Sequence, residues 1–215
     1  MEISVDQMYQ IENNGHKMGF LKKFMMENAG AAAVRRLLEK FGNLESKNIV
    51  IFAGMGNNGG DGLVMARHFA GYGSKVIVVL LGSPENIKTE ESRWNWEILK
   101  KMSSIKLISG TKTDFNFDPD IVVDGILGTG IKGTIKEPYS SAIKYINRLN
   151  CYKFSVDVPS GLDPDNGETS NIFVRADMTV TFHKMKRGIP KRKDLTGELF
   201  VEKIGIPREA EEGVF

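Results

Sequence analysis

The sequence contains few of the residues that make disulfides, zinc sites or membrane spans. Among its 215 residues there are one cysteine, Cys151, and three histidines. A single thiol excludes an internal disulfide, and the few Cys and His side chains form no zinc-binding cluster, so we expect a reducing, cytoplasmic setting. The first seven residues lack the basic start and apolar core of a signal peptide. The longest aliphatic run, 76–81, is far too short to cross a bilayer, so we expect no membrane partner.

The sequence also lacks a strong charge of either sign. Its 29 basic and 27 acidic residues give a formal net charge of +2, which provides no general attraction to nucleic acid or to a membrane surface. No Pro/Ser-rich linker divides the chain, and a hydrophobic content of 41% suffices for one substantial core. We therefore expect residues 1–215 to form a single domain whose ligand is indicated by local sites.

Short apolar runs alternate with helical patterns along most of the chain. Strands are expected at 49–53, 76–81, 105–108, 121–123, 153–156, 178–181 and 199–202, and helices at 62–71, 90–102 and 140–149, after a helical pair within 4–41 that Ser4 or Asp6 caps. This alternation predicts an α/β protein, a three-layer αβα Rossmann-like fold with a doubly wound, mostly parallel sheet. The first five strands are expected in the order 3-2-1-4-5.

The first of three polar segments follows the strand at 49–53. Gly54, Gly56 and Gly59 have the G-x-G-x-x-G spacing that brings backbone N–H groups and a helix N-terminus to a phosphate. The alternative is a tight turn in which glycine only permits a positive φ. Asn57, Asn58 and Asp61 are more polar than such a turn requires, which favours a binding role.

A second glycine segment follows the fourth strand. Gly128, Gly130 and Gly133 repeat the same spacing. In a 3-2-1-4-5 sheet the carboxyl ends of strands one and four flank the crevice where ligands bind. Two such segments facing each other across this crevice predict a phosphate-bearing ligand.

The third segment ends the fifth strand. Asp157 lies between Val156 and Val158 and precedes a Pro-Ser-Gly turn. A carboxyl group at the mouth of an apolar strand is a candidate general acid or base. The alternative is an Asx cap that accepts N–H bonds from the following turn.

Two common nucleotide-binding patterns are missing. No acidic residue closes the second strand, where 80–83 read Leu-Leu-Gly-Ser, although a dinucleotide-binding oxidoreductase normally holds a ribose there. No Gly-Lys-Ser/Thr follows the first glycines, so there is no P-loop. Ordinary hydride transfer is therefore disfavoured.

Oxygen donors recur in the three segments. Asn58, Asp124 and Ser160 would suit a hard cation, although each also has a loop-capping explanation. A basic stretch at 183–193 carries six Lys/Arg. We interpret most of it as a solvated loop from which one or two side chains approach ligand phosphates. Nucleic acid is disfavoured because no aromatic residues interleave.

Together, residues 25–30, 56–62, 124 with 128–134, and 156–161 resemble the NAD(P)H-hydrate epimerases, the YjeF N-terminal family, over nearly the whole chain. The resemblance implies an isomerase that interconverts the R and S forms of hydrated NADH and NADPH (NADHX and NADPHX), which are substrates and not cofactors. It implies one K⁺ per subunit, held by Asn58, Asp124 and Ser160, and a ligand role for Asp157, our candidate acid/base. The implied substrate-binding residues are Asn57, Asn58, Gly59, Gly60, Asp61, Gly128, Thr129, Gly130, Ile131, Lys132, Gly133, Thr134 and Asp157.

The resemblance also implies partners. Many relatives are fused to a hydrate dehydratase, which these 215 residues do not include, so we expect a functional link to a separate dehydratase and a homodimer. Lys186-Arg187-Gly188 stands where the family usually has Lys-Pro-Gly, and the basic stretch is a candidate for binding a 2′-phosphate. The alternative function is a nucleotide- or RNA-binding scaffold of the same fold without catalysis, which has no need for Asp157.

Overall fold

The computed structural model describes residues 2–130 and 133–215. One sheet runs through the described chain, with strand order β3-β2-β1-β4-β5-β6-β7 and every neighbouring pair parallel. The strands are β1 (Asn48–Ala53), β2 (Lys75–Leu81), β3 (Ile105–Gly110), β4 (Ile121–Gly125), β5 (Tyr152–Val156), β6 (Met178–Phe182) and β7 (Glu198–Glu202). The predicted doubly wound fold and the order of its first five strands are confirmed.

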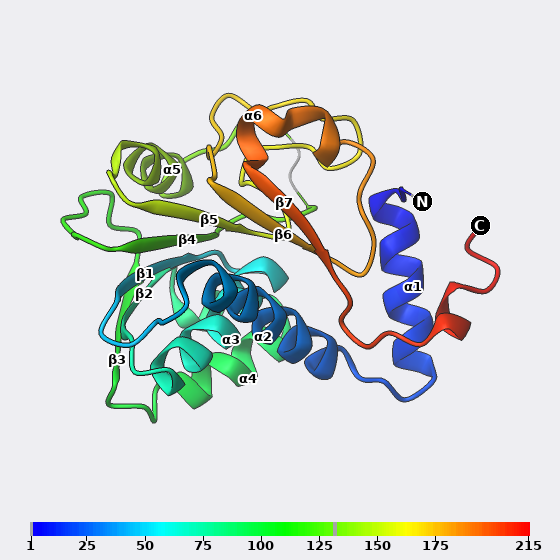
Figure 1. Cartoon of the computed structure of the whole chain (residues 1–215), viewed down its shortest axis with the longest axis horizontal. Coiled ribbons are helices and arrows are strands. Elements are labelled where there is room, and N and C mark those ends of the chain that lie inside the picture. Colours follow the sequence, from blue (N-terminus) through cyan, green and yellow to red (C-terminus); the bar gives the residue numbers. More distant parts are fainter. Residues whose placement is uncertain (1, 131–132) are drawn as a thin grey trace.

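Helices cover both faces of this sheet (Figure 1). Below it in that view lie α2 (Lys22–Phe41), α3 (Asn57–Gly71) and α4 (Glu90–Leu99), and above it lie α5 (Tyr139–Arg148) and the short α6 (Lys193–Thr196). Strands buried on both faces account for the continuous apolar runs, and β4 is buried at all five positions. Among the described residues, no helix combines the length and apolar character needed to cross a membrane.

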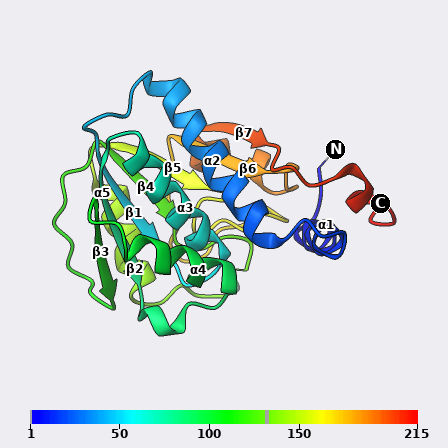
Figure 2. The same ribbon diagram turned by 90° about the horizontal axis from the view of Figure 1, so that it is seen from below.

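The N-terminal helix α1 (Val5–Lys17) lies apart from these layers, at the carboxyl ends of the strands and beside the C-terminal segment (Figures 1 and 2). Its start is fixed by a capping box in which Ser4 Oγ accepts a bond from the Gln7 amide and Gln7 Oε1 accepts one from the Ser4 amide. Asp165 Oδ1 accepts the Val5 N–H at 2.8 Å, and Ile3 forms a parallel bridge with Lys186. These contacts hold α1 across the strand ends, and the predicted Ser4 cap is confirmed.

The first glycine segment differs from its predicted form. Helix α3 begins at Asn57, so 57–62 is helical and the expected start at 62 is wrong. The glycines serve close packing: a Cβ on Gly59 would lie 1.9 Å from the Gly54 carbonyl oxygen, and a Cβ on Gly54 would lie 1.8 Å from that of Ile126. Neither glycine has a positive φ, so the tight-turn alternative is also wrong.

Candidate functional site

A pocket opens at the carboxyl ends of the central strands, between them and α1. Its walls come from α1 through Val5, Met8, Tyr9 and Glu12, from α2 through Lys22, Met25, Met26 and Ala29, from α3 through Asn57, Asn58 and Asp61, and from the loops through Gly128, Thr129, Asp157 and Lys186. The place is the switch point of the sheet, where β1 lies between β2 and β4 and the connections turn to opposite faces. The pocket therefore lies where the strand order predicts a ligand.

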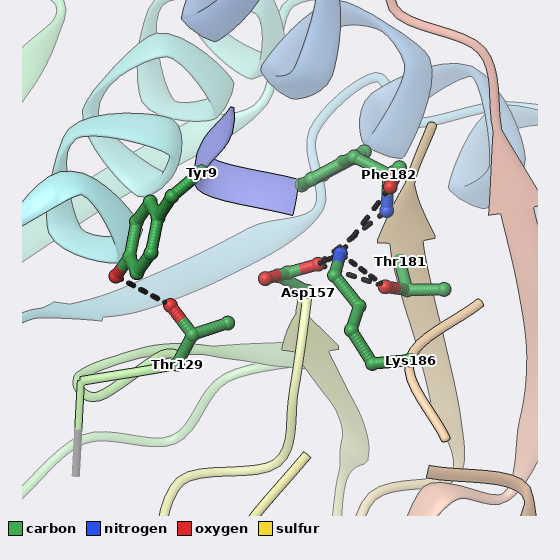
Figure 3. Close-up of polar contacts among 6 residues, drawn as sticks. All are labelled: Tyr9, Thr129, Asp157, Thr181, Phe182 and Lys186. Carbon is green, nitrogen blue, oxygen red and sulfur yellow. Dashed lines mark hydrogen bonds and ion pairs between the residues drawn. The ribbon is translucent and has the colours of Figure 1, made fainter. Parts of the chain in front are cut away.

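An ion pair between Asp157 and Lys186 occupies the floor of this pocket (Figure 3). Lys186 Nζ donates to Asp157 Oδ1 at 2.6 Å, to Thr181 Oγ1 at 2.9 Å and to the Phe182 carbonyl at 3.2 Å. These three acceptors use the three donors of the ammonium group, and Lys186 as a residue is 1% exposed. Lys186 is therefore a fixed counter-ion, and the expectation of a solvated basic loop does not hold for this residue.

Asp157 uses one carboxylate oxygen for the protein. Its Oδ1 accepts from Lys186, from Thr181 Oγ1 at 2.8 Å and from the Phe182 amide at 3.4 Å. The other oxygen has no partner in residues 2–130 and 133–215, and in Figure 3 it points away from Lys186, to the side where Thr129 and Tyr9 lie. The predicted alternative of an Asx cap on the following turn is wrong, because all these donors come from β6 and the loop after it.

The backbone of Asp157 is unusual. Its φ is +61°, in the left-handed region that few residues other than Gly, Asn and Asp adopt readily. This conformation directs the carboxylate from the end of β5 toward β6 and Lys186. A local backbone cost is thus compensated by the three hydrogen bonds at Oδ1.

Asp124 performs the capping that Asp157 does not. Its Oδ2 accepts the Ser160 amide at 2.8 Å and Ser155 Oγ at 2.9 Å, and its Oδ1 accepts Ser160 Oγ at 2.5 Å. Burial raises the pKa of Asp124, while the Ser160 and Ser155 bonds oppose that rise. The carboxyl group has no ion-pair partner in the described parts of the chain, and it ties the end of β4 to the loop after β5.

Asn58 lies close to this buried network. Its side chain is buried, and neither its oxygen nor its nitrogen finds a hydrogen-bond partner among the described residues. A Cβ on Gly128 would lie 3.2 Å from the Asn58 Cβ, so the second glycine segment does face α3. An unpartnered buried amide is costly, and its presence beside a pocket indicates a missing ligand or ion.

Two further carboxyl groups lie in the same pocket. Burial raises the pKa of Glu12 to about 7; Lys186 opposes this rise and Asp157 adds to it. Burial, followed by repulsion from Asp157 and Glu12, also raises the pKa of Asp61. Glu12, Asp61 and Asp157 thus share one pocket with Glu91 and with the cations Lys186 and Lys22, which favours a protonated carboxyl group beside an ionised one.

A hydrogen bond spans the opening between α1 and the second glycine segment. Tyr9 Oη and Thr129 Oγ1 are 2.9 Å apart (Figure 3). Tyr9 is 41% exposed, so it covers the pocket from the solvent side.

The predicted site residues fall into three groups. Those that line the pocket are Asn57, Asn58, Asp61, Gly128, Thr129 and Asp157. Gly59 and Gly60 do not line it, and a Cβ on Gly60 would contact Ser92 and Met26. Gly130, Gly133 and Thr134 do not line it either, and Ile131 and Lys132 lie outside the described residues.

Several lining residues were not predicted as site residues. The α1 residues Tyr9 and Glu12 carry no local motif, and only the docking of α1 across the strand ends places them at the site. Met25 and Met26 belong to the segment 25–30 on which the resemblance rests, but neither was predicted to contact a ligand; both are buried on α2 and line the pocket.

Comparison with known proteins places this geometry in a family. Residues 22–188 match the family described as "YjeF-related protein N-terminus". The chain belongs to this family. Two relatives named NAD(P)H-hydrate epimerase match over the full length of both chains, at 77% identity in Nitrosopumilus maritimus and 64% in Cenarchaeum symbiosum. The crystal structure of yeast ynu0 superposes with a TM-score of 0.82 at 25% identity, covering 98% of this chain and 91% of that one.

Family members also occur within longer proteins. A relative in Methanothermobacter thermautotrophicus named "Bifunctional NAD(P)H-hydrate repair enzyme Nnr" is 45% identical over 207 residues. The match covers 92% of this chain and 39% of that protein, so the present chain corresponds to one part of the bifunctional relative.

Proposed function

We propose that this protein interconverts the R and S epimers of hydrated NADH and NADPH. The full-length relatives at 77% and 64% identity are named NAD(P)H-hydrate epimerase. The observation that carries the proposal is the state of Asp157 at the switch-point pocket, held by Lys186 through one carboxylate oxygen with the other free of described protein partners. A binding scaffold has no need for a carboxylate prepared in this way.

The substrate chemistry requires an acid, a base and exclusion of bulk water. In the hydrate, water has added to C6 of the reduced nicotinamide ring, so C6 bears a hydroxyl next to the ring nitrogen. Protonation of the hydroxyl lets the C6–O bond break as the nitrogen lone pair forms a planar cation. Water then returns to C6 from the other face and loses a proton to a base. We assign Asp157 to this proton transfer through its free oxygen.

The remainder of the dinucleotide would lie along the two glycine segments. The N-terminus of α3, a helix of 15 residues, opens at Asn57 beside Gly128 and Thr129, and helix N-termini favour anionic groups. We therefore assign the phosphate-bearing part of the substrate to Asn57–Asp61 and to 128–134.

We assign a potassium ion to Asn58, Asp124 and Ser160. The donor set fits, because Asp124 is a buried carboxylate without an ion-pair partner among the described residues, and the Asn58 side-chain amide is buried without a partner. The two residues are neighbours in space, since a Cβ on Gly125 would lie 3.1 Å from the Asn58 backbone oxygen. Oxygen donors of this kind suit a hard cation. Bound there, potassium would supply positive charge that holds the three segments together and offsets substrate phosphate.

Three broader assignments follow the same proposal. We assign residues 1–215 to one epimerase-type domain, since one sheet runs through the described chain. We place the protein in the cytoplasm as a homodimer acting with a separate dehydratase. The bifunctional relatives, which combine repair activities by name, support that functional link.

Incubation of the protein with each separated epimer, followed by chromatography, tests the proposal. We expect each epimer to yield the equilibrium mixture faster than in a protein-free control. A static composition, together with RNA retained on a filter in a salt-dependent manner, would support the scaffold alternative instead.

A further inference from the structure

The α1 wall of the pocket carries a second ionisable group. Val5, Met8, Tyr9 and Glu12 are separated by three or four residues, so they share one face of α1, and all four line the pocket. Val5 and Met8 are buried, and Tyr9 bonds to Thr129 at the opening. Glu12 is therefore a carboxyl group on an otherwise apolar and aromatic wall. No hydrogen bond or ion pair engages it within the described residues.

Glu12 and Asp157 approach the pocket from different sides. Asp157 directly follows β5 at the carboxyl edge of the sheet, whereas Glu12 belongs to α1, which lies across the strand ends (Figure 1). Asp157 is fixed by Lys186, Thr181 and Phe182 and cannot move to the α1 side without losing those bonds. A ring bound between α1 and the strand ends would have one carboxyl group on each face.

Epimerisation by loss and return of water needs a proton-transfer group on each face. The leaving hydroxyl must be protonated on one face of the ring, and the incoming water must be deprotonated on the other. A single fixed carboxylate can serve one face only, so it would return water to the side from which water left. Asp157 alone therefore explains exchange of the hydroxyl but not inversion at C6.

We propose that Glu12 is the second catalytic acid/base group of the epimerisation, acting on the face of the ring opposite Asp157. This inference rests on the proposed function. Glu12 donates a proton to the hydroxyl, the C6–O bond breaks, and the nitrogen lone pair forms the C=N bond of the cation. Water attacks C6 from the other face, the C=N electrons return to nitrogen, and Asp157 takes the water proton. One water leaves, one enters, and the reverse reaction uses the opposite protonation states.

The charges around the pocket agree with Glu12 as the proton donor and Asp157 as the proton acceptor. Glu12 is half-buried and faces Lys186, Asp157, Asp61 and Lys22, with Glu91 also on the wall. Because the pKa of Glu12 is raised to about 7, chiefly by burial, the group holds a proton in a substantial fraction of molecules near neutral pH. Asp157 Oδ1 lies 2.6 Å from Lys186 Nζ.

Exchange of the C6 hydroxyl with ¹⁸O-labelled water distinguishes the role of Glu12 from that of Asp157. Each pure epimer is incubated in H₂¹⁸O with wild type, Glu12→Gln and Asp157→Asn, and both epimerisation and label uptake into the unconverted epimer are followed by chromatography and mass spectrometry. Glu12→Gln should lower epimerisation by on the order of 10² or more, while label still enters the epimer whose hydroxyl faces Asp157. Asp157→Asn should confine label uptake to the other epimer. Asp6→Asn, an exposed acid on the same helix, is the matched control.

The outcomes are distinct. Wild-type epimerisation rates in Glu12→Gln, or equal loss of exchange from both epimers in a variant that melts like wild type, would overturn the role of Glu12. Failure of the wild-type protein to interconvert the epimers would instead overturn the proposed function itself.

Discussion

Lys186 Nζ lies 2.6 Å from Oδ1 of Asp157 and uses its two other donors on Thr181 and Phe182. The pair joins the end of β5 to the loop after β6 and leaves the second carboxylate oxygen without a described protein partner. It makes Asp157 a positioned anion at the floor of the pocket.

Removal of the Asp157 charge should abolish most activity. Asparagine adopts positive φ readily and its amide oxygen still accepts from Lys186, so Asp157→Asn should remain folded. We expect epimerisation to fall by on the order of 10² or more, measured by chromatography. Asp118→Asn, an exposed acid between β3 and β4, is the control. Near-normal turnover in Asp157→Asn would remove this residue from the mechanism.

Removal of the Lys186 charge should destabilise the fold. Lys186→Met leaves the Asp157 carboxylate without its cation in a largely buried place, which should lower the free energy of unfolding by about 3–5 kcal/mol. Adding Asp157→Asn to that variant should recover part of the loss, as urea titrations can measure. The exposed pair Lys40–Glu198 provides the comparison, since Lys40→Met should cost about 0–1 kcal/mol. Equal effects of the two lysine variants would contradict the account.

The same substitution at two glycines of α3 should have opposite effects. Gly59→Ala would place a methyl group 1.9 Å from the Gly54 carbonyl oxygen, and the backbone must move, at a cost of about 1–3 kcal/mol or more. Gly71→Ala meets no atom within 4 Å and should stabilise the protein by about 0.4–1 kcal/mol. Thermal melts of both variants test this, and a neutral Gly59→Ala would show that the close contact carries no constraint.

Stability should fall as the pH rises from about 4.5 to about 7. The pKa of Glu12 is raised from 4.5 to about 7 in the folded protein, so between these values the native state binds more protons than the unfolded state. The contribution is complete below the unfolded pKa and is lost as pH passes the folded pKa. Urea titrations at pH 5 and pH 7.5 should show a smaller difference for Glu12→Gln than for wild type. An equal change in the free energy of unfolding between the two pH values in both proteins would contradict the raised pKa of Glu12.

Potassium should stabilise the wild-type protein. An ion that binds only the folded state raises the free energy of unfolding by about 2.7 kcal/mol at one hundred times its Kd, and the melting temperature rises with it. The melting temperature in KCl should exceed that in NaCl of equal ionic strength, and Asn58→Ala should abolish the difference. Identical wild-type melting temperatures in the two salts would argue against the ion.

The sheet could be predicted from sequence because each buried strand is a short β-branched run between helical patterns. The start of α3 could not, because Gly and Asn at 57–62 have low helix propensity and only contact with the strand ends makes them helical. Asp157 could be predicted as a site residue because Val156 and Val158 flank it at the end of a predicted strand. Glu12 did not, because its place in the pocket depends on the Ile3–Lys186 bridge and the Asp165 bond that dock α1, contacts more than 150 residues apart. Lys186 was hidden among solvated basic residues for the same reason.

The conversion of one pure hydrate epimer in H₂¹⁸O by the wild-type protein tests the central claim most directly. The account predicts that the opposite epimer appears faster than in the protein-free control and carries ¹⁸O at C6. Appearance of the opposite epimer at the same rate as in the protein-free control would contradict the assigned activity. An inverted product without ¹⁸O would contradict the loss and return of water at C6.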